Sequence, residues 1–126
     1  MAMDPGWAPG TARSLTRCVR RSYRLELMAA GQLCLLWLSG PTLPGVHALG
    51  TIEGPVSTDD DGPAVPVRLV LLAEPVSRGE LLVDPRMRSA EVLRMPAGSN
   101  PSWLSAEQFG AVLDRADSGC LERWRP

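Results

Sequence analysis

Hydrophobic positions follow three different patterns along this chain. Residues 27–38 form a nearly unbroken apolar run, residues 65–73 are apolar at every second position, and apolar residues between 109 and 116 recur at helical spacing. Alternation with period two is typical of a strand with one buried face, whereas a spacing of three to four is typical of an amphipathic helix. The patterns predict an N-terminal apolar segment, a central strand and a C-terminal helix.

The alternating stretch 65–73 predicts the strongest strand of the chain. One of its faces consists of apolar residues only, namely Val65, Val67, Leu69, Leu71 and Ala73. The opposite face begins with Pro66 and Arg68 but continues with Val70 and Leu72. We therefore expect one buried face and a second face that is covered only towards its end.

Shorter apolar runs predict two flanking strands, at 51–57 and at 80–84. The aspartate-rich stretch 58–63 predicts a turn in which Gly62 supplies a positive φ. Residues 74–79 contain proline and glycine and predict a loop.

The segment after these strands allows two interpretations. Asp84 followed by Pro85 is typical of a helix start, with the aspartate as N-cap. Residues 90–95 lack a clean helical face. We predict a short helix or turn over 85–89, followed by a third strand.

A C-terminal amphipathic helix is predicted from its start signal and its apolar face. Ser105 and Gln108 have the spacing of a capping box. The apolar face consists of Phe109, Val112, Leu113 and Ala116. Gly119 is expected to end the helix. The predicted fold is therefore a small α+β domain, with an antiparallel sheet of two to four strands and one C-terminal helix.

The apolar run 27–38 predicts an export signal. Five arginines precede it, and Val46-His47-Ala48 follows it as a small-x-small cleavage site. This order predicts a signal-peptide helix within residues 1–48 and a mature domain of residues 49–126. The run is shorter than the ~20 residues that span a membrane. A retained membrane anchor and a core helix stay open as alternatives.

The formal charge changes sign at the predicted cleavage site. Residues 1–48 carry five arginines and two acidic residues, a balance of +3, whereas residues 49–126 carry eight arginines and twelve acidic residues, a balance of −4. A nucleic-acid-binding domain normally has a basic face or stripe. The predicted mature domain is mildly acidic, so we predict no nucleic-acid partner.

The residue types of the predicted mature domain exclude several catalytic mechanisms. The chain has no lysine, and its only histidine, His47, lies before the predicted cleavage site. Ser-His-acid catalysis, histidine-bound zinc and lysine Schiff bases are therefore excluded there. Cys120 is the one cysteine left, which is too few for a thiolate cage or a disulfide framework. We predict no catalytic residue and no cofactor.

Three consecutive aspartates, Asp59, Asp60 and Asp61, are the candidate metal ligands. Carboxylate oxygens and the glycine that follows suit calcium. Ligands in calcium loops alternate along the chain, however, so a solvated acidic turn is the competing interpretation. A small carboxylate- or calcium-dependent hydrolase is therefore the alternative function.

Binding of a protein partner, or self-association, is the leading function. A domain as small as residues 49–126 without disulfides has a limited core, and association adds stability. The candidate contact residues are Trp103, Phe109 and Trp124, together with the edge of the strand 65–73. Ordinary core packing is the competing interpretation for each of them.

Together the patterns predict a small exported, non-enzymatic protein, periplasmic or secreted. It binds a partner or serves as a structural accessory outside the cytoplasmic membrane. A membrane-anchored small subunit that retains residues 27–48 is the further alternative, and only that segment would contact the membrane.

Overall fold

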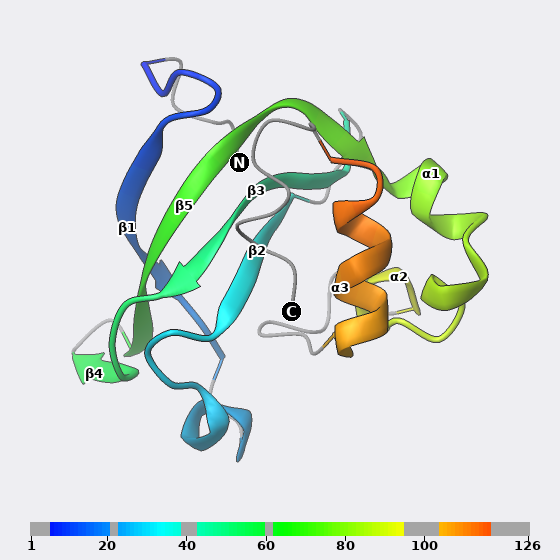
Figure 1. The fold of residues 1–126 in the computed structure, drawn as a ribbon. Helices are drawn as coiled ribbons and strands as arrows, with labels where there is room; N and C mark the ends of the chain where they lie inside the picture. Colours follow the sequence, from blue (N-terminus) through cyan, green and yellow to red (C-terminus); the bar gives the residue numbers. More distant parts are fainter. Residues whose placement is uncertain (1–5, 21–22, 39–42, 60–61, 95–103, 117–126) are drawn as a thin grey trace.

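A computed structural model shows a curved antiparallel sheet with short helices beside it (Figure 1). The structure describes residues 6–20, 23–38, 43–59, 62–94 and 104–116. The strands are β1 (Ala12–Cys18), β2 (Leu33–Leu38), β3 (Gly45–Ile52), β4 (Ser57–Asp59) and β5 (Gly62–Ser77). Their order in the sheet is β1-β5-β3-β2, and β4 pairs with the start of β5.

The described helices are short. They are α1 (Arg78–Leu82), α2 (Glu91–Arg94) and α3 (Ala106–Leu113), with the 3-10 helices η1 (Tyr23–Leu27) and η2 (Pro85–Met87). The predicted fold of two to four strands, one C-terminal helix and a preceding signal-peptide helix was therefore wrong. Among the described residues the chain forms a five-stranded sheet with three short α-helices.

The long strand β5 is the centre of the sheet. It pairs with β1 on one side, and with β4 and then β3 on the other. The predicted strand 65–73 is confirmed as part of it. Val70 and Leu72, on the face that begins with Arg68, are buried as expected, because helices cover that end of the sheet.

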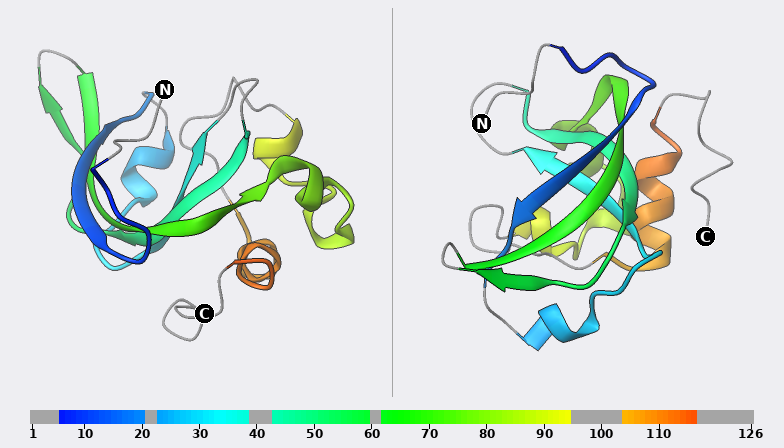
Figure 2. Two further views of the ribbon diagram at one scale, coloured as in Figure 1. Left: turned by 90° about the horizontal axis from the view of Figure 1, so that it is seen from above. Right: turned by 90° about the vertical axis from the view of Figure 1, so that its left-hand side faces the viewer.

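The curvature of the sheet separates two apolar cores. In the left view of Figure 2, η1 lies on the inner side of the curve and α3 on the outer side. The inner cluster contains Trp7, Leu36, Ala48, Ile52, Val65, Val67 and Leu69. The outer cluster joins Val46, Leu49, Val70, Leu72 and Val76 of the sheet to the helices, among them Leu81, Met87 and Leu113. Because β3 and β5 contribute to both clusters, they are buried on both faces.

The predicted loop 74–79 and strand 80–84 were wrong. Strand β5 continues to Ser77, and α1 begins directly after it. Ser77 and Glu80 form a complete capping box, in which the serine Oγ accepts from the Glu80 N–H at 3.1 Å. This box satisfies backbone donors of the first helical turn, and it therefore stabilises a helix where the apolar residues alone indicated a strand.

The segment after α1 was predicted in part. Asp84 caps η2 and Pro85 occupies its first turn, which confirms the predicted helix start. The strand predicted over 90–95 was wrong, since Glu91–Arg94 is the helix α2. Its apolar residues Val92 and Leu93 are buried in the outer cluster beside Met87, so packing against other helices decides their conformation.

The capping box predicted for the C-terminal helix is confirmed, because Ser105 Oγ accepts from the Gln108 N–H at 3.1 Å. The helix ends at Leu113, earlier than the predicted end at Gly119, which lies outside the described residues. Ala116 lies beyond the helix but still packs against the outer cluster. The helix therefore keeps its predicted apolar face over a shorter length.

The apolar run 27–38 forms no helix over most of its length. The 3-10 helix η1 ends at Leu27, Gly31 adopts a φ of 90°, and residues 33–38 are β2. A left-handed glycine interrupts helical geometry, and pairing with β3 fixes the following residues as a strand. The predicted cleavage point after Ala48 lies inside β3, where Ala48 and Leu49 are both buried.

Candidate functional site

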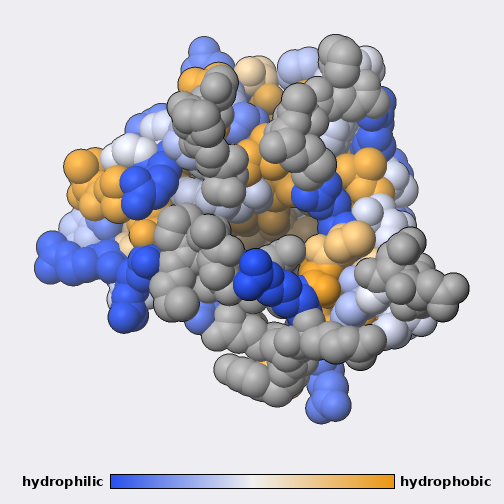
Figure 3. Space-filling view, turned by 180° about the vertical axis from the view of Figure 1, so that it is seen from behind, coloured by the Kyte–Doolittle hydropathy of each residue, from blue (hydrophilic) through white to orange (hydrophobic). Residues whose placement is uncertain are grey.

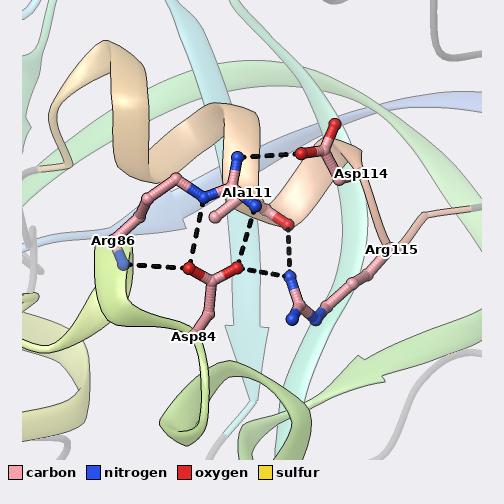
Figure 4. A network of polar contacts seen from close by, with 5 residues as sticks. All are labelled: Asp84, Arg86, Ala111, Asp114 and Arg115. Carbon is pink, nitrogen blue, oxygen red and sulfur yellow. Dashed lines mark hydrogen bonds and ion pairs between the residues drawn. The ribbon is translucent and has the colours of Figure 1, made fainter.

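Among the described residues, a dense polar cluster joins the start of η2 to the end of α3 (Figure 4). Asp84 Oδ1 accepts hydrogen bonds from Arg86 N at 2.9 Å and Arg86 Nε at 3.2 Å. Its Oδ2 accepts from Arg86 Nη2 at 2.8 Å and Arg115 Nη1 at 2.6 Å. Arg86 Nη1 also donates to Asp114 Oδ2 at 2.8 Å. Both carboxylate oxygens of Asp84 are therefore engaged by arginine.

This cluster is a structural clamp. Asp84 is only 5% exposed, and the hydrogen bonds from Arg86 and Arg115 hold its pKa far below the usual range of an aspartate. The same contacts with Asp84 and Asp114 raise the pKa of Arg86. A carboxylate that stays ionised and is bonded on both oxygens cannot exchange protons near neutral pH. The cluster therefore ties η2 to α3 and offers no acid or base.

The candidate contact residues do not come together on a described surface. Phe109 is 7% exposed and packs in the outer cluster, so it is a core residue. Trp103 and Trp124 lie outside the described residues, and so does Cys120. The proposed contact edge of strand 65–73 is also occupied, because β5 pairs with a strand on each side.

The candidate metal site falls largely outside the described residues. Asp60 and Asp61 lie there, and only the backbone of Asp59, at the end of β4, is described. In the described ranges, no three His, Cys, Asp or Glu residues come together in a way that could hold a metal ion. The calcium hypothesis stays a prediction.

The described ranges also contain no helix that is both long and apolar enough to cross a bilayer.

His47 occupies an irregular position in β3, where the register with β2 shifts, and its Nε2 lies 2.8 Å from the Leu43 carbonyl oxygen. The histidine is thus held by the backbone beside it.

Figure 3 shows the molecule from behind, and on this face apolar side chains are visible in a hollow. The inner face of the curved sheet lies on this side (Figure 2). Its central residues, such as Ala48, Val65 and Leu69, are all buried. The inner cluster is therefore core packing.

Strands β1 and β2 form the two outer edges of the sheet. Unlike β5, each of them lacks a described strand on its outer side. On β2, the Gln32 carbonyl accepts a 2.9 Å hydrogen bond from the Ile52 N–H of β3. Bonded positions alternate along an antiparallel pair, so the even-numbered residues of β2 face β3. The register shifts between Leu36 and Trp37, but the extra residue is His47 of β3, so the alternation of β2 itself continues past the shift. The N–H and C=O groups of Leu33, Leu35 and Trp37 therefore point to the outer edge.

The chemistry of the two edges is different. Strand β1 carries Arg13 and Arg17, and the Arg13 guanidinium lies 5.4 Å from the centre of the Trp7 ring. Strand β2 reads Leu-Cys-Leu-Leu-Trp-Leu, without charge, proline or glycine. Natural sheets protect their edges with charged residues, proline or bulges. By this measure charge protects β1. Strand β2 has neither charge nor proline, and its one irregularity is the register shift between Leu36 and Trp37, where the extra residue lies in β3 and not on the outer edge.

The start of β2 also carries exposed apolar surface. Leu27 is 59% exposed and Leu33 is 36% exposed. The Gln32 side chain holds this corner together, since its Nε2 donates to the Leu27 carbonyl at 2.9 Å and its Oε1 accepts from the Ala29 N–H at 3.0 Å. We call Leu27 and residues 33–38 together the β2 edge.

A polar atom on the same strand is unsatisfied. The indole Nε1 of Trp37 is buried and has no hydrogen-bond acceptor among the described residues. Buried donors in folded proteins almost always have a partner. The β2 edge therefore combines exposed apolar side chains with outward backbone groups that no described strand pairs, and a buried indole N–H without a described acceptor lies beside it.

Comparison of the chain with protein-family models, with curated proteins and with solved structures finds no match.

The β2 edge was not predicted, because the apolar run 27–38 indicated a signal helix. A signal for the alternative was present, since the run 33–38 is short and follows Gly31. A short apolar run bounded by turn residues is consistent with a buried strand. Its pairing with β3, however, depends on residues that follow in the chain and is not visible in the run itself.

Proposed function

We propose that this chain is a non-enzymatic binding protein that takes up a protein partner by strand addition at the β2 edge. The observation that carries the proposal is the row of outward N–H and C=O groups of Leu33, Leu35 and Trp37, on a strand without charge or proline. Backbone groups of this kind bind an extended segment of a partner as a further strand.

The absence of charged side chains on β2 also favours a protein partner. The side chains of β2 are apolar, and Leu27 and Leu33 extend this surface at its start. An apolar strand edge suits a partner that supplies main-chain hydrogen bonds together with apolar side chains.

In this proposal the residues of the predicted signal act within the fold. Strands β1 and β2 and half of β3 come from residues 1–48, so the binding edge exists only in the uncleaved chain. Export to the periplasm or the medium stays a prediction. The hydrolase alternative finds no support in Asp84, the only buried charged residue of the described ranges, because arginines occupy both its oxygens.

Photo-crosslinking in the source cells tests the proposal. A benzophenone amino acid at position 33 places the reactive group on the β2 edge, and the same group at Val83, which is 78% exposed on the helical side, is the matched control. We expect a protein adduct from position 33 and none from position 83. No adduct at position 33, or equal adducts at both positions, would contradict binding at this edge.

A further inference from the structure

The β2 edge is complementary to itself. The outward residues Leu33, Leu35 and Trp37 are spaced symmetrically about Leu35. A two-fold axis through Leu35 would set this residue opposite Leu35 of a second copy, and Leu33 opposite Trp37 of that copy. In an antiparallel pair, opposing residues exchange both N–H···O bonds. All the outward backbone groups would then be satisfied together.

The side chains fit this pairing as well as the backbone does. Every second side chain of a strand points to the same face, so Leu33, Leu35 and Trp37 share one face of β2. On that face Leu35 and Trp37 already pack against the outer cluster. Pairing would place Leu33 of one copy beside Trp37 of the other and would cover the exposed part of Leu33. Aromatic and aliphatic cross-strand pairs of this kind stabilise sheets.

Charge distinguishes this edge from the other one. Self-pairing of β1 about its middle residue, Leu15, would set Arg13 opposite Arg17 of the second copy. Like charges in directly opposed positions are destabilising. Strand β2 has no charged residue, so antiparallel self-pairing brings no repulsion there. The comparison favours a dimer that closes through β2.

We infer that the partner at the β2 edge is a second copy of this chain, which joins antiparallel about a two-fold axis to make one continuous sheet. This inference rests on the proposed function and names the occupant of that same edge. A symmetric contact of this kind uses the same surface on both copies, so assembly stops at the dimer.

Sedimentation equilibrium of the full-length protein over a range of concentrations tests the inference. We expect a reversible monomer–dimer equilibrium, with a monomer of 13.6 kDa. The variant Leu33→Lys replaces the apolar contact with Trp37 of the second copy by a charged side chain, and it is expected to weaken the dimer by roughly tenfold or more. Val83→Lys makes the same chemical change on the helical side and should leave the equilibrium unchanged.

Hydrogen exchange of the wild-type protein gives a readout that does not depend on a variant. The amides of Leu35 and Trp37 should be protected at concentrations where the dimer forms and should exchange fast where the monomer dominates. The buried amide of Leu49 in β3 is the internal control, since its protection should not follow assembly.

The possible failures are distinguishable. A monomer at all concentrations that still yields a crosslink from position 33 to another protein overturns the dimer but keeps the proposed function. Species larger than a dimer overturn the two-fold closure and indicate head-to-tail pairing of unlike edges. A monomer without any crosslink from position 33 overturns both proposals.

Discussion

Arg115 donates a 2.6 Å hydrogen bond from its Nη1 to the buried carboxylate of Asp84, 31 residues earlier in the chain. The contact joins the end of α3 to the start of η2, and Arg86 completes it from the other side of the carboxylate (Figure 4). Because α3 packs on the outer face of the sheet, this clamp fixes the helical layer over the outer cluster.

The clamp predicts an acid-dependent loss of stability. The pKa of Asp84 is lowered in the folded protein, so the unfolded chain takes up the proton first as the pH falls. The stabilisation is complete above the pKa of an unperturbed aspartate, about 3.9, and decreases below it towards the lower folded pKa. We expect Asp84→Asn to unfold at lower denaturant concentration at pH 7.

The difference in the free energy of unfolding between Asp84→Asn and the wild type should shrink as the pH falls below about 4. Urea unfolding followed by circular dichroism between pH 2.5 and pH 7 measures it. Glu107→Gln, which removes an exposed carboxylate at the start of α3, is the control. An equal pH dependence of the wild type and Asp84→Asn would contradict the role of Asp84.

Gly50 predicts a second effect on stability. A Cβ at this position would lie 1.8 Å from the Arg68 carbonyl oxygen and 2.8 Å from the Leu69 Cα, in the backbone of β5. Gly50→Ala therefore has to separate β3 from β5, and we expect it to destabilise the protein by about 3 kcal/mol or more. Thermal unfolding measures the change.

The matched control for this substitution is Gly110→Ala in α3. A Cβ at Gly110 meets no atom within 4 Å, and alanine is favoured over glycine inside a helix by roughly 0.5–1 kcal/mol. The two variants should thus shift the melting temperature in opposite directions. A mild effect of Gly50→Ala would show that β3 and β5 are not as closely apposed as described.

Cys18 and Cys34 are expected to differ in reactivity. Cys18 is exposed on β1, whereas burial raises the pKa of the Cys34 thiol on β2 to about 12. At pH 8 a thiol with that pKa has a thiolate fraction on the order of 10⁻⁴, and the thiolate is the reactive form. Timed iodoacetamide labelling with peptide mapping should find Cys18 modified well before Cys34.

Addition of urea beyond the unfolding transition is the control for this experiment, because both thiols should then react at similar rates. Fast labelling of Cys34 under native conditions would place it outside the inner cluster. It would then contradict the position of β2 in the sheet.

The fragment 49–126 separates the two interpretations of the N-terminal region. Without residues 1–48 the sheet loses β1, β2 and half of β3, and buried residues such as Leu49 and Val67 lose their neighbours. We expect the fragment to show no cooperative unfolding transition, whereas the full chain shows one. A cooperatively folded fragment would support cleavage after Ala48 instead.

The sequence alone determined the elements whose signals are local. The alternation 65–73, the Ser105/Gln108 capping box, and Asp84 before Pro85 each depend on neighbours in the chain, and the predicted strand and both helix starts form. Of the predicted buried face, Val65, Val67 and Leu69 are buried, whereas Leu71 is half-buried and Ala73 is exposed. The positive φ of Gly62 belongs to the same group. Periodicity and capping are short-range effects, so a single sequence records them.

Only the tertiary structure decided the conformation of residues 27–38 and the position of the candidate binding edge on β2. A short apolar run has the same composition whether it crosses a bilayer, forms a helix or joins a sheet. Its pairing with β3 makes it a strand, and the lack of a described partner on its other side makes it an open edge. The burial of Phe109 and the pairing of strand 65–73 on both sides have the same origin, because burial and strand neighbours depend on residues far away in the chain.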